Sequence, residues 1–73
     1  VAGAAVENGI RRLLVRTSND NLDAFRFYQR RDFRLEKVVP GAIDEERKLK
    51  PEIPALGEYG IPIRDEVVFA RRL

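Results

Sequence analysis

The sequence predicts an α+β fold in which a small mixed β-sheet is combined with helices, in the order helix tail, strand, helix, strand, long loop, strand. Three observations carry this prediction. The apolar run Leu13-Leu14-Val15 is followed by residues that favour a helix start. Apolar residues then recur at helical spacing, and alternating segments follow at 33–39 and 66–73. A strand–helix–strand unit favours parallel or mixed pairing with a right-handed crossover.

The first eighteen residues predict a helix end and a buried strand. Residues 1–8 carry Ala2, Ala5 and Val6 at helical spacing, and Asn8-Gly9 supplies residues that tolerate the left-handed geometry of a helix C-cap. The apolar run within 10–17 is typical of a strand that is covered on both faces. We therefore expect the chain to begin in a helix and to enter the sheet at residue 10.

The central helix is expected over residues 22–31. Four cap-forming residues, Ser18-Asn19-Asp20-Asn21, precede it. A step of about 100° per residue places its apolar side chains on one wide arc and places Asp23, Arg26 and Arg30 on the solvent side. The arc consists of Leu22, Ala24, Phe25, Phe27 and Tyr28. It is wider than one sheet contact requires, so this helix is expected to flank something besides the sheet.

The second half of the chain predicts two strands separated by a long excursion. Residues 33–39 alternate as a strand, and Pro40-Gly41 ends it. A short helix is expected at 43–49, followed by a loop rich in proline and glycine up to residue 64. Residues 66–73 predict the last strand, which would pair antiparallel with the preceding one.

Composition excludes several classes of protein. The 73 residues contain 14 basic and 12 acidic side chains, interspersed, so the net charge of +2 does not indicate a nucleic-acid-binding face. The absence of cysteine and histidine removes disulfides and the usual ligands of a structural zinc, and no metal site is expected. No apolar run is long enough to span a membrane, so we expect no membrane partner and a cytoplasmic location.

The segment from 21 to 33 carries a motif of known type. Asn21, Ala24, Tyr28 and Phe33 stand at the spacing of a hallmark stretch of the GNAT superfamily of acetyl-CoA-dependent N-acetyltransferases, which this chain resembles, and Asp32 replaces the glycine of that pattern. The resemblance implies that 1–73 is a single partial domain, the C-terminal segment of a GNAT fold. The family's glycine-rich turn, whose backbone N–H groups hold the cofactor pyrophosphate, does not occur in this sequence.

The resemblance also implies roles for individual residues. An amine acceptor would attack the thioester of acetyl-CoA, the co-substrate, and Tyr28 would be the catalytic residue that gives a proton to the departing thiolate. Asn21 would hydrogen-bond the pantetheine arm, Ala24 would let the cofactor pass close to the helix, and Phe27 would lie alongside it. Without the pyrophosphate turn, we expect the isolated chain to be inactive or nearly so.

The residues alone leave other interpretations open. Tyr28 and Phe27 fit an amphipathic helix as core residues, and an asparagine at a helix start is usually a cap. The alternative function is a non-catalytic interaction or dimerisation module, a homo-oligomer formed through exposed sheet edges. The resemblance implies a left-handed backbone at Asp32, which replaces the glycine of the family pattern at the helix end, at a cost of about 1 kcal/mol.

Overall fold

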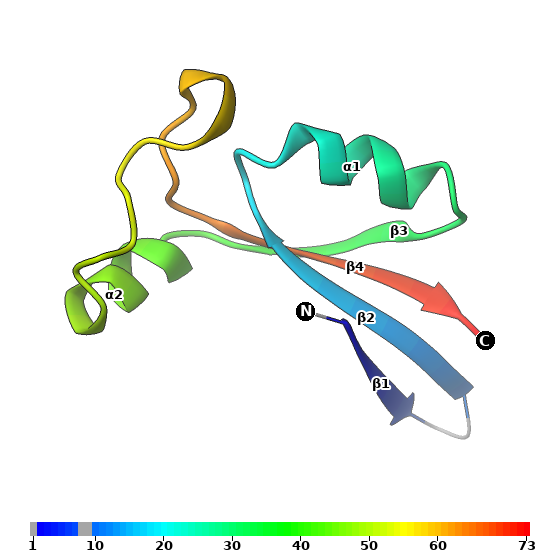
Figure 1. Cartoon of the computed structure of the whole chain (residues 1–73). Helices are drawn as coiled ribbons and strands as arrows, with labels where there is room; N and C mark the ends of the chain where they lie inside the picture. The colour runs from blue at the N-terminus through cyan, green and yellow to red at the C-terminus, as the bar shows by residue number, and fades with distance from the viewer. Residues whose placement is uncertain (1, 8–9) are drawn as a thin grey trace.

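A sheet of four antiparallel strands organises the part of the chain that the computed structural model describes, residues 2–7 and 10–73 (Figure 1). The spatial order of its strands is β1-β2-β4-β3. The elements in chain order are β1 (Ala2–Glu7), β2 (Ile10–Ser18), α1 (Leu22–Gln29), β3 (Arg34–Val39), α2 (Ala42–Leu49), the 3₁₀ turn η1 (Glu58–Gly60) and β4 (Glu66–Arg72). The predicted α+β class is confirmed.

The last strand lies between the two strands that α1 connects. β4 pairs antiparallel with β2 on one side and with β3 on the other, so β2 and β3 run in the same direction without touching. The predicted antiparallel pairing of the last two strands is confirmed. The predicted mixed sheet is wrong, because every described pairing is antiparallel: the long excursion brings the chain back into the gap that the strand–helix–strand unit leaves open.

The N-terminal segment is a strand, which corrects the predicted helix over 1–8. β1 pairs antiparallel with β2, with Ala4 opposite Leu13 and Val6 opposite Arg11. A short alanine-rich helix is marginal without tertiary contacts, whereas the free edge of β2 presents a row of unpaired backbone groups. Pairing with that edge therefore outweighs local helix propensity. The predicted helix stop at Asn8-Gly9 lies outside the described residues.

The core forms between α1 and one face of the sheet. Phe69, at the centre of β4, is 0% exposed, and its ring lies 5.2 Å from that of Phe25 in an edge-to-face arrangement. Tyr28 packs against both Phe33 and Phe69. Buried Val15 and Val67 complete this cluster. The apolar arc predicted for the helix thus meets the sheet as expected.

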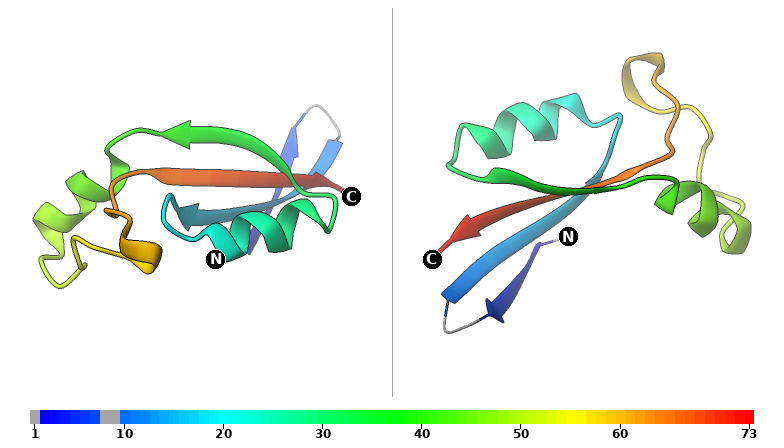
Figure 2. Two further views of the ribbon diagram at one scale, coloured as in Figure 1. Left: turned by 90° about the horizontal axis from the view of Figure 1, so that it is seen from above. Right: turned by 180° about the vertical axis from the view of Figure 1, so that it is seen from behind.

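The other face of the sheet carries no helix among the described elements (Figure 2). β2 was expected to be covered on both faces, and this is wrong for the part of the chain that the structure describes. Arg12 and Arg16 stand on the face away from α1, opposite Arg72 and Val68 of β4. Val68 is only 5% exposed, since the stems of long charged side chains can cover apolar surface while their heads stay in water.

Helix α1 ends two residues earlier than predicted, and the reason lies at Asp32. This residue has φ 69°, which confirms the expected left-handed backbone. The turn directs the amides of Arg31 and Phe33 to the carbonyl of Tyr28, each at 3.0 Å. The carbonyl groups of the last helical turn have no amide partner within the helix, and this turn gives them hydrogen bonds before β3 begins.

Polar side chains hold the excursion between β3 and β4 against the start of α1. Asn19 donates from Nδ2 to the carbonyl of Pro62 at 2.9 Å and accepts at Oδ1 from the amide of Arg64 at 2.9 Å. Asp20, only 4% exposed, accepts from Ser18 Oγ and from the amide of Glu58 at 2.9 Å. Two of the four predicted cap residues therefore position a segment about forty residues away in sequence.

Arg47 of α2 holds the middle of the excursion together. Its guanidinium donates to the carbonyls of Ile53 at 3.0 Å, Pro54 at 2.8 Å and Ile63 at 2.7 Å. A planar fork of donors suits several carbonyls at once, which a lysine could not match. None of the described helices is long and apolar enough to cross a membrane.

Candidate functional site

An open, shallow pocket of about 330 Å³ lies along α1 and is lined by Asp23, Ala24, Phe27 and Tyr28. Three of these residues were singled out from the sequence. They meet because positions three and four apart share one side of a helix. Ala24 contributes only a methyl group, so the pocket reaches close to the helix backbone at this point.

Tyr28 combines a packed ring with a position at the pocket. Its ring lies edge-on to Phe33 at 5.2 Å and to Phe27 at 5.1 Å, which anchors it in the core. Among the described residues, no protein group hydrogen-bonds its hydroxyl. Both interpretations of Tyr28 thus describe part of its surroundings: the ring is a core group, and the residue also lines the pocket.

Phe27 is a surface residue, which corrects the interpretation that it belongs to the core. Its side chain is 47% exposed, and the guanidinium carbon of Arg31 lies 3.6 Å from the centre of its ring. Arg31 also donates to the carbonyl of Phe27 at 3.0 Å. A cation over an aromatic face is favourable, and here it fixes the ring beside the pocket.

Asn21 caps the helix and does not line the pocket. Its Oδ1 accepts from the amide of Ala24 at 3.1 Å, and its Nδ2 donates to Thr17 Oγ1 at 3.1 Å. The cap interpretation is therefore confirmed. One N–H and one lone pair of the side-chain amide remain outside these two bonds, because a primary amide offers two donors and two acceptor sites.

Asp23 is the lining residue that sequence reasoning missed, since helical spacing placed it on the solvent side. Its Oδ1 accepts from the hydroxyl of Tyr59 at 2.7 Å, which brings η1 to the rim of the pocket. The hydrogen bond to Asp23 and the charge of that carboxylate raise the pKa of Tyr59. The two residues are 36 positions apart, so no local pattern could have paired them.

Comparison with known proteins finds relatives of unestablished function. No family model matches the chain, and no solved structure matches it. The chain is 43% identical over 70 residues to YxbD, an uncharacterised protein of Bacillus subtilis strain 168, in a match that covers 96% of this chain and 44% of YxbD. It is 47% identical over 60 residues to YdhI, another uncharacterised protein of that strain, covering 82% of this chain and 38% of YdhI. The chain therefore spans less than half the length of these relatives.

Proposed function

We propose that the chain forms part of an N-acetyltransferase that transfers an acetyl group from acetyl-CoA to an amine, with the pocket along α1 receiving the thioester end of the co-substrate. One observation carries the proposal: Tyr28 lines an open pocket while no described protein group occupies its hydroxyl. The motif of Asn21, Ala24, Tyr28 and Phe33, which resembles the GNAT pattern, gives that pocket its chemical interpretation.

The proposed reaction needs one proton donor at the sulfur. The acceptor nitrogen attacks the thioester carbonyl, a tetrahedral intermediate forms, and the C–S bond breaks as the carbonyl is restored. The sulfur leaves with the bonding pair and takes the phenolic proton of Tyr28, while the acceptor nitrogen loses its proton to solvent or to a base. The phenol first hydrogen-bonds the negative charge as it develops on the sulfur, and the proton is transferred as the C–S bond breaks.

The neighbours of Tyr28 support a linear ligand along the helix. Ala24, one turn earlier, leaves room for an arm to pass, and the exposed ring of Phe27 offers an apolar wall. Asn21 lies a further turn back, where its remaining N–H could meet an amide carbonyl of the pantetheine arm. The cofactor pyrophosphate would be held by residues outside this sequence, so the isolated chain is expected to show almost no turnover.

Binding of acetyl-CoA to the ¹⁵N-labelled chain, followed by NMR, tests the pocket without requiring turnover. We expect saturable shifts at Ala24, Phe27 and Tyr28. Ala24→Leu would fill the pocket and abolish these shifts, whereas Ala55→Leu, the same change at an exposed position of the excursion, would leave them intact. Absence of shifts with the unmodified chain, or equal shifts with Ala24→Leu, would contradict the proposal.

Activity provides the second arm of the test. In a full-length protein that contains this segment, Tyr28→Phe should lower kcat about 100-fold with KM little changed, because loss of a general acid costs roughly that factor while the ring and its packing remain. Wild-type turnover by the isolated 73-residue chain at the rate of an intact enzyme would contradict the expectation that it lacks the pyrophosphate-binding part.

A second candidate, a non-catalytic dimerisation module, is favoured by the outer edge of β3. This strand ends the sheet and carries Leu35 at 52% and Val38 at 57% exposure. The same strand has an irregular register between Leu35 and Lys37, and bulges and charges on edge strands oppose strand addition. Sedimentation at rising concentration distinguishes the two: a dimer that Leu35→Lys dissociates would favour this candidate.

A further inference from the structure

The sheet face away from α1 gathers arginines from three neighbouring strands. Arg12 of β2 stands directly opposite Arg72 of β4, and Arg34 of β3 stands opposite Ala70 of β4. Residues that are paired across strands point to the same face, and residues two apart on one strand share a face. Arg12, Arg34 and Arg72 therefore lie on one face, around Ala70.

This face is more basic than the chain as a whole. On β2, β3 and β4 it carries five basic side chains and two acidic ones, a net of +3, whereas the whole chain has a net charge of +2. The set consists of Arg12, Arg16, Arg34, Lys37 and Arg72 with Glu36 and Glu66. On these three strands, the charges that look evenly mixed along the sequence therefore give a positive excess on the face away from α1.

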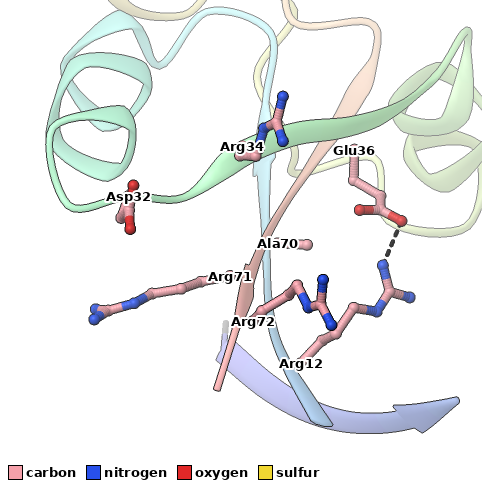
Figure 3. A pocket seen from close by; sticks show the side chains of 7 residues that line it. All are labelled: Arg12, Asp32, Arg34, Glu36, Ala70, Arg71 and Arg72. Atoms are coloured by element: carbon pink, nitrogen blue, oxygen red, sulfur yellow. Dashed lines mark hydrogen bonds and ion pairs between the residues drawn. The ribbon is translucent and has the colours of Figure 1, made fainter. Parts of the chain in front are cut away.

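Figure 3 shows the residues that line a pocket at one end of this face: four arginines, the two carboxylates Asp32 and Glu36, and Ala70. The volume of this pocket is about 470 Å³. Ala70, 6% exposed, lies between the arginines, and Glu36 pairs with Arg12 at its margin. Arg71 extends away from the guanidinium groups of Arg12 and Arg72 (Figure 3). Among the described residues, neither Arg34 nor Arg72 has an acidic partner within ion-pair distance.

Like charges directly opposite each other disfavour strand pairing, and the ion pair of Arg12 with Glu36 offsets part of that repulsion. An anion between the guanidinium groups would remove that repulsion. A planar guanidinium fork binds carboxylate or phosphate with two parallel hydrogen bonds. A carboxylate has two oxygens and one charge, whereas a phosphate has more acceptor oxygens and up to two charges, and it can satisfy several arginines at once.

We propose that the pocket formed by Arg12, Arg34 and Arg72 binds a compact phosphate-bearing anion. Among the described residues that line this face there is no aromatic side chain on which a base could stack, and single-stranded nucleic acids usually need such stacking in addition to a basic groove. The small hollow therefore fits a phosphate or diphosphate group better than an extended chain. This site is on the opposite side of the sheet from Tyr28 and is independent of the proposed acetyl transfer.

Titration of the ¹⁵N-labelled chain with inorganic pyrophosphate, at ionic strength held constant with sodium chloride, tests the site. Saturable shifts are expected at Arg12, Arg34 and residues 70–72. Arg72→Gln should weaken binding about threefold, the size expected for one solvent-exposed charge. Arg11→Gln is the matched control, since it removes the same charge from the residue next to Arg12 on β2, whose side chain is on the other face of the strand and does not line the pocket.

Glu36→Gln provides a test in the opposite direction. It removes one carboxylate that pairs with Arg12 and leaves the net charge of the pocket more positive, so pyrophosphate should bind more tightly. Circular dichroism on each variant establishes that the sheet is intact. Binding that Glu36→Gln leaves unchanged or weakens in a folded variant would overturn the proposed role of Arg12.

Three further results would overturn the proposal. Equal weakening by Arg11→Gln and Arg72→Gln would mean that only net charge matters. Shifts that sodium chloride alone reproduces would mean a general salt effect. Tighter binding of a single-stranded oligonucleotide than of pyrophosphate at the same salt would assign the face to an extended polyanion. Acetyl-CoA shifts at Ala24 and Tyr28 are measured separately, so failure of either proposal is distinguishable from failure of the other.

Discussion

The sheet with α1 and the excursion between β3 and β4 are stabilised by different kinds of contact. In the sheet, Phe69 and its neighbours are buried against the helix. In the excursion, no residue from 40 to 65 is buried. The segment is fixed by hydrogen bonds that Asn19 and Arg47 donate and that Asp20 accepts. The stability of the sheet therefore depends on the apolar surface that folding buries, whereas that of the excursion depends on a few hydrogen bonds.

This difference predicts which substitutions should destabilise the whole fold and which should destabilise only one segment. Apolar burial supplies most of the free energy of folding, so loss of the central ring affects every element. Hydrogen bonds at the surface of a loop contribute less and act on the segment that they hold. The effects of substitutions in the two regions should therefore differ both in the loss of stability and in how much of the molecule unfolds.

Phe69→Ala should have the largest effect. Removal of a fully buried phenylalanine costs about 4 kcal/mol, a large part of the 5–15 kcal/mol that stabilises a typical domain. We expect loss of the sheet signal in circular dichroism at room temperature. Leu49→Ala, at 86% exposure in α2, is the control and should change stability by less than about 0.5 kcal/mol. Equal effects of the two substitutions would refute the assignment of the core.

Gly57→Ala should disturb the excursion and leave the sheet in place. A Cβ at this position would lie 2.0 Å from Asp20 Oδ2 and 2.6 Å from Ile63 Cγ1. Such overpacking costs about 2 kcal/mol. Hydrogen exchange should accelerate at the amides of Gly57 and Ile63 while that of Phe69 stays protected. Gly60→Ala meets no atom within 4 Å and tests backbone strain alone, so it should cost less. Uniform acceleration across β4 would show that the two regions unfold together.

Asp20 makes the excursion sensitive to acid. Burial raises the pKa of Asp20, but hydrogen bonds from Ser18, from the amide of Glu58 and from its own amide outweigh burial and lower that pKa below the ordinary value of 3.8. The folded state therefore favours the carboxylate, and this stabilisation is present above about pH 4 and is lost as the pH falls through the lowered pKa.

Asp20→Asn measures that contribution. The two donors use different oxygens of the carboxylate, and an amide puts an NH₂ group at one of those positions, so the variant should lose about 1.5 kcal/mol at neutral pH. The difference from wild type should shrink as the pH falls through the lowered pKa of Asp20, because the wild-type carboxyl then becomes protonated. Denaturant unfolding at several pH values gives both quantities. A difference that stays constant with pH would mean that the charge of Asp20 is not involved.

Asp32→Gly should have the smallest effect and the opposite sign. At φ 69° a glycine avoids the steric cost of a side chain, so stability should rise by about 0.5–1 kcal/mol and the melting temperature with it. Asp44→Gly, within α2, is the matched substitution at a helical position and should lower stability. A melting temperature that does not rise with Asp32→Gly would contradict the assigned strain.

Much of the candidate site could be predicted because it lies on one helix. Ala24, Phe27 and Tyr28 share a side of α1 through spacing alone, and Asn21 caps the helix as its chemistry favours. Asp23 was missed because its role depends on Tyr59, which only the folded excursion brings near. Local periodicity describes neighbours three or four residues apart, and it carries no information on a partner from another element.

Local chemistry alone determined the α1 helix, its cap, the left-handed Asp32 and the alternating strands, since each depends on residues within one or two turns. Tertiary structure decided which strands are neighbours: it put β4 between β2 and β3, drew residues 2–7 into the sheet and gathered Arg12, Arg34 and Arg72 on one face. The physical reason is that the unpaired N–H and C=O groups of an edge strand can pair with any other strand. Which strands become neighbours therefore depends on which edges remain open once the whole chain is folded.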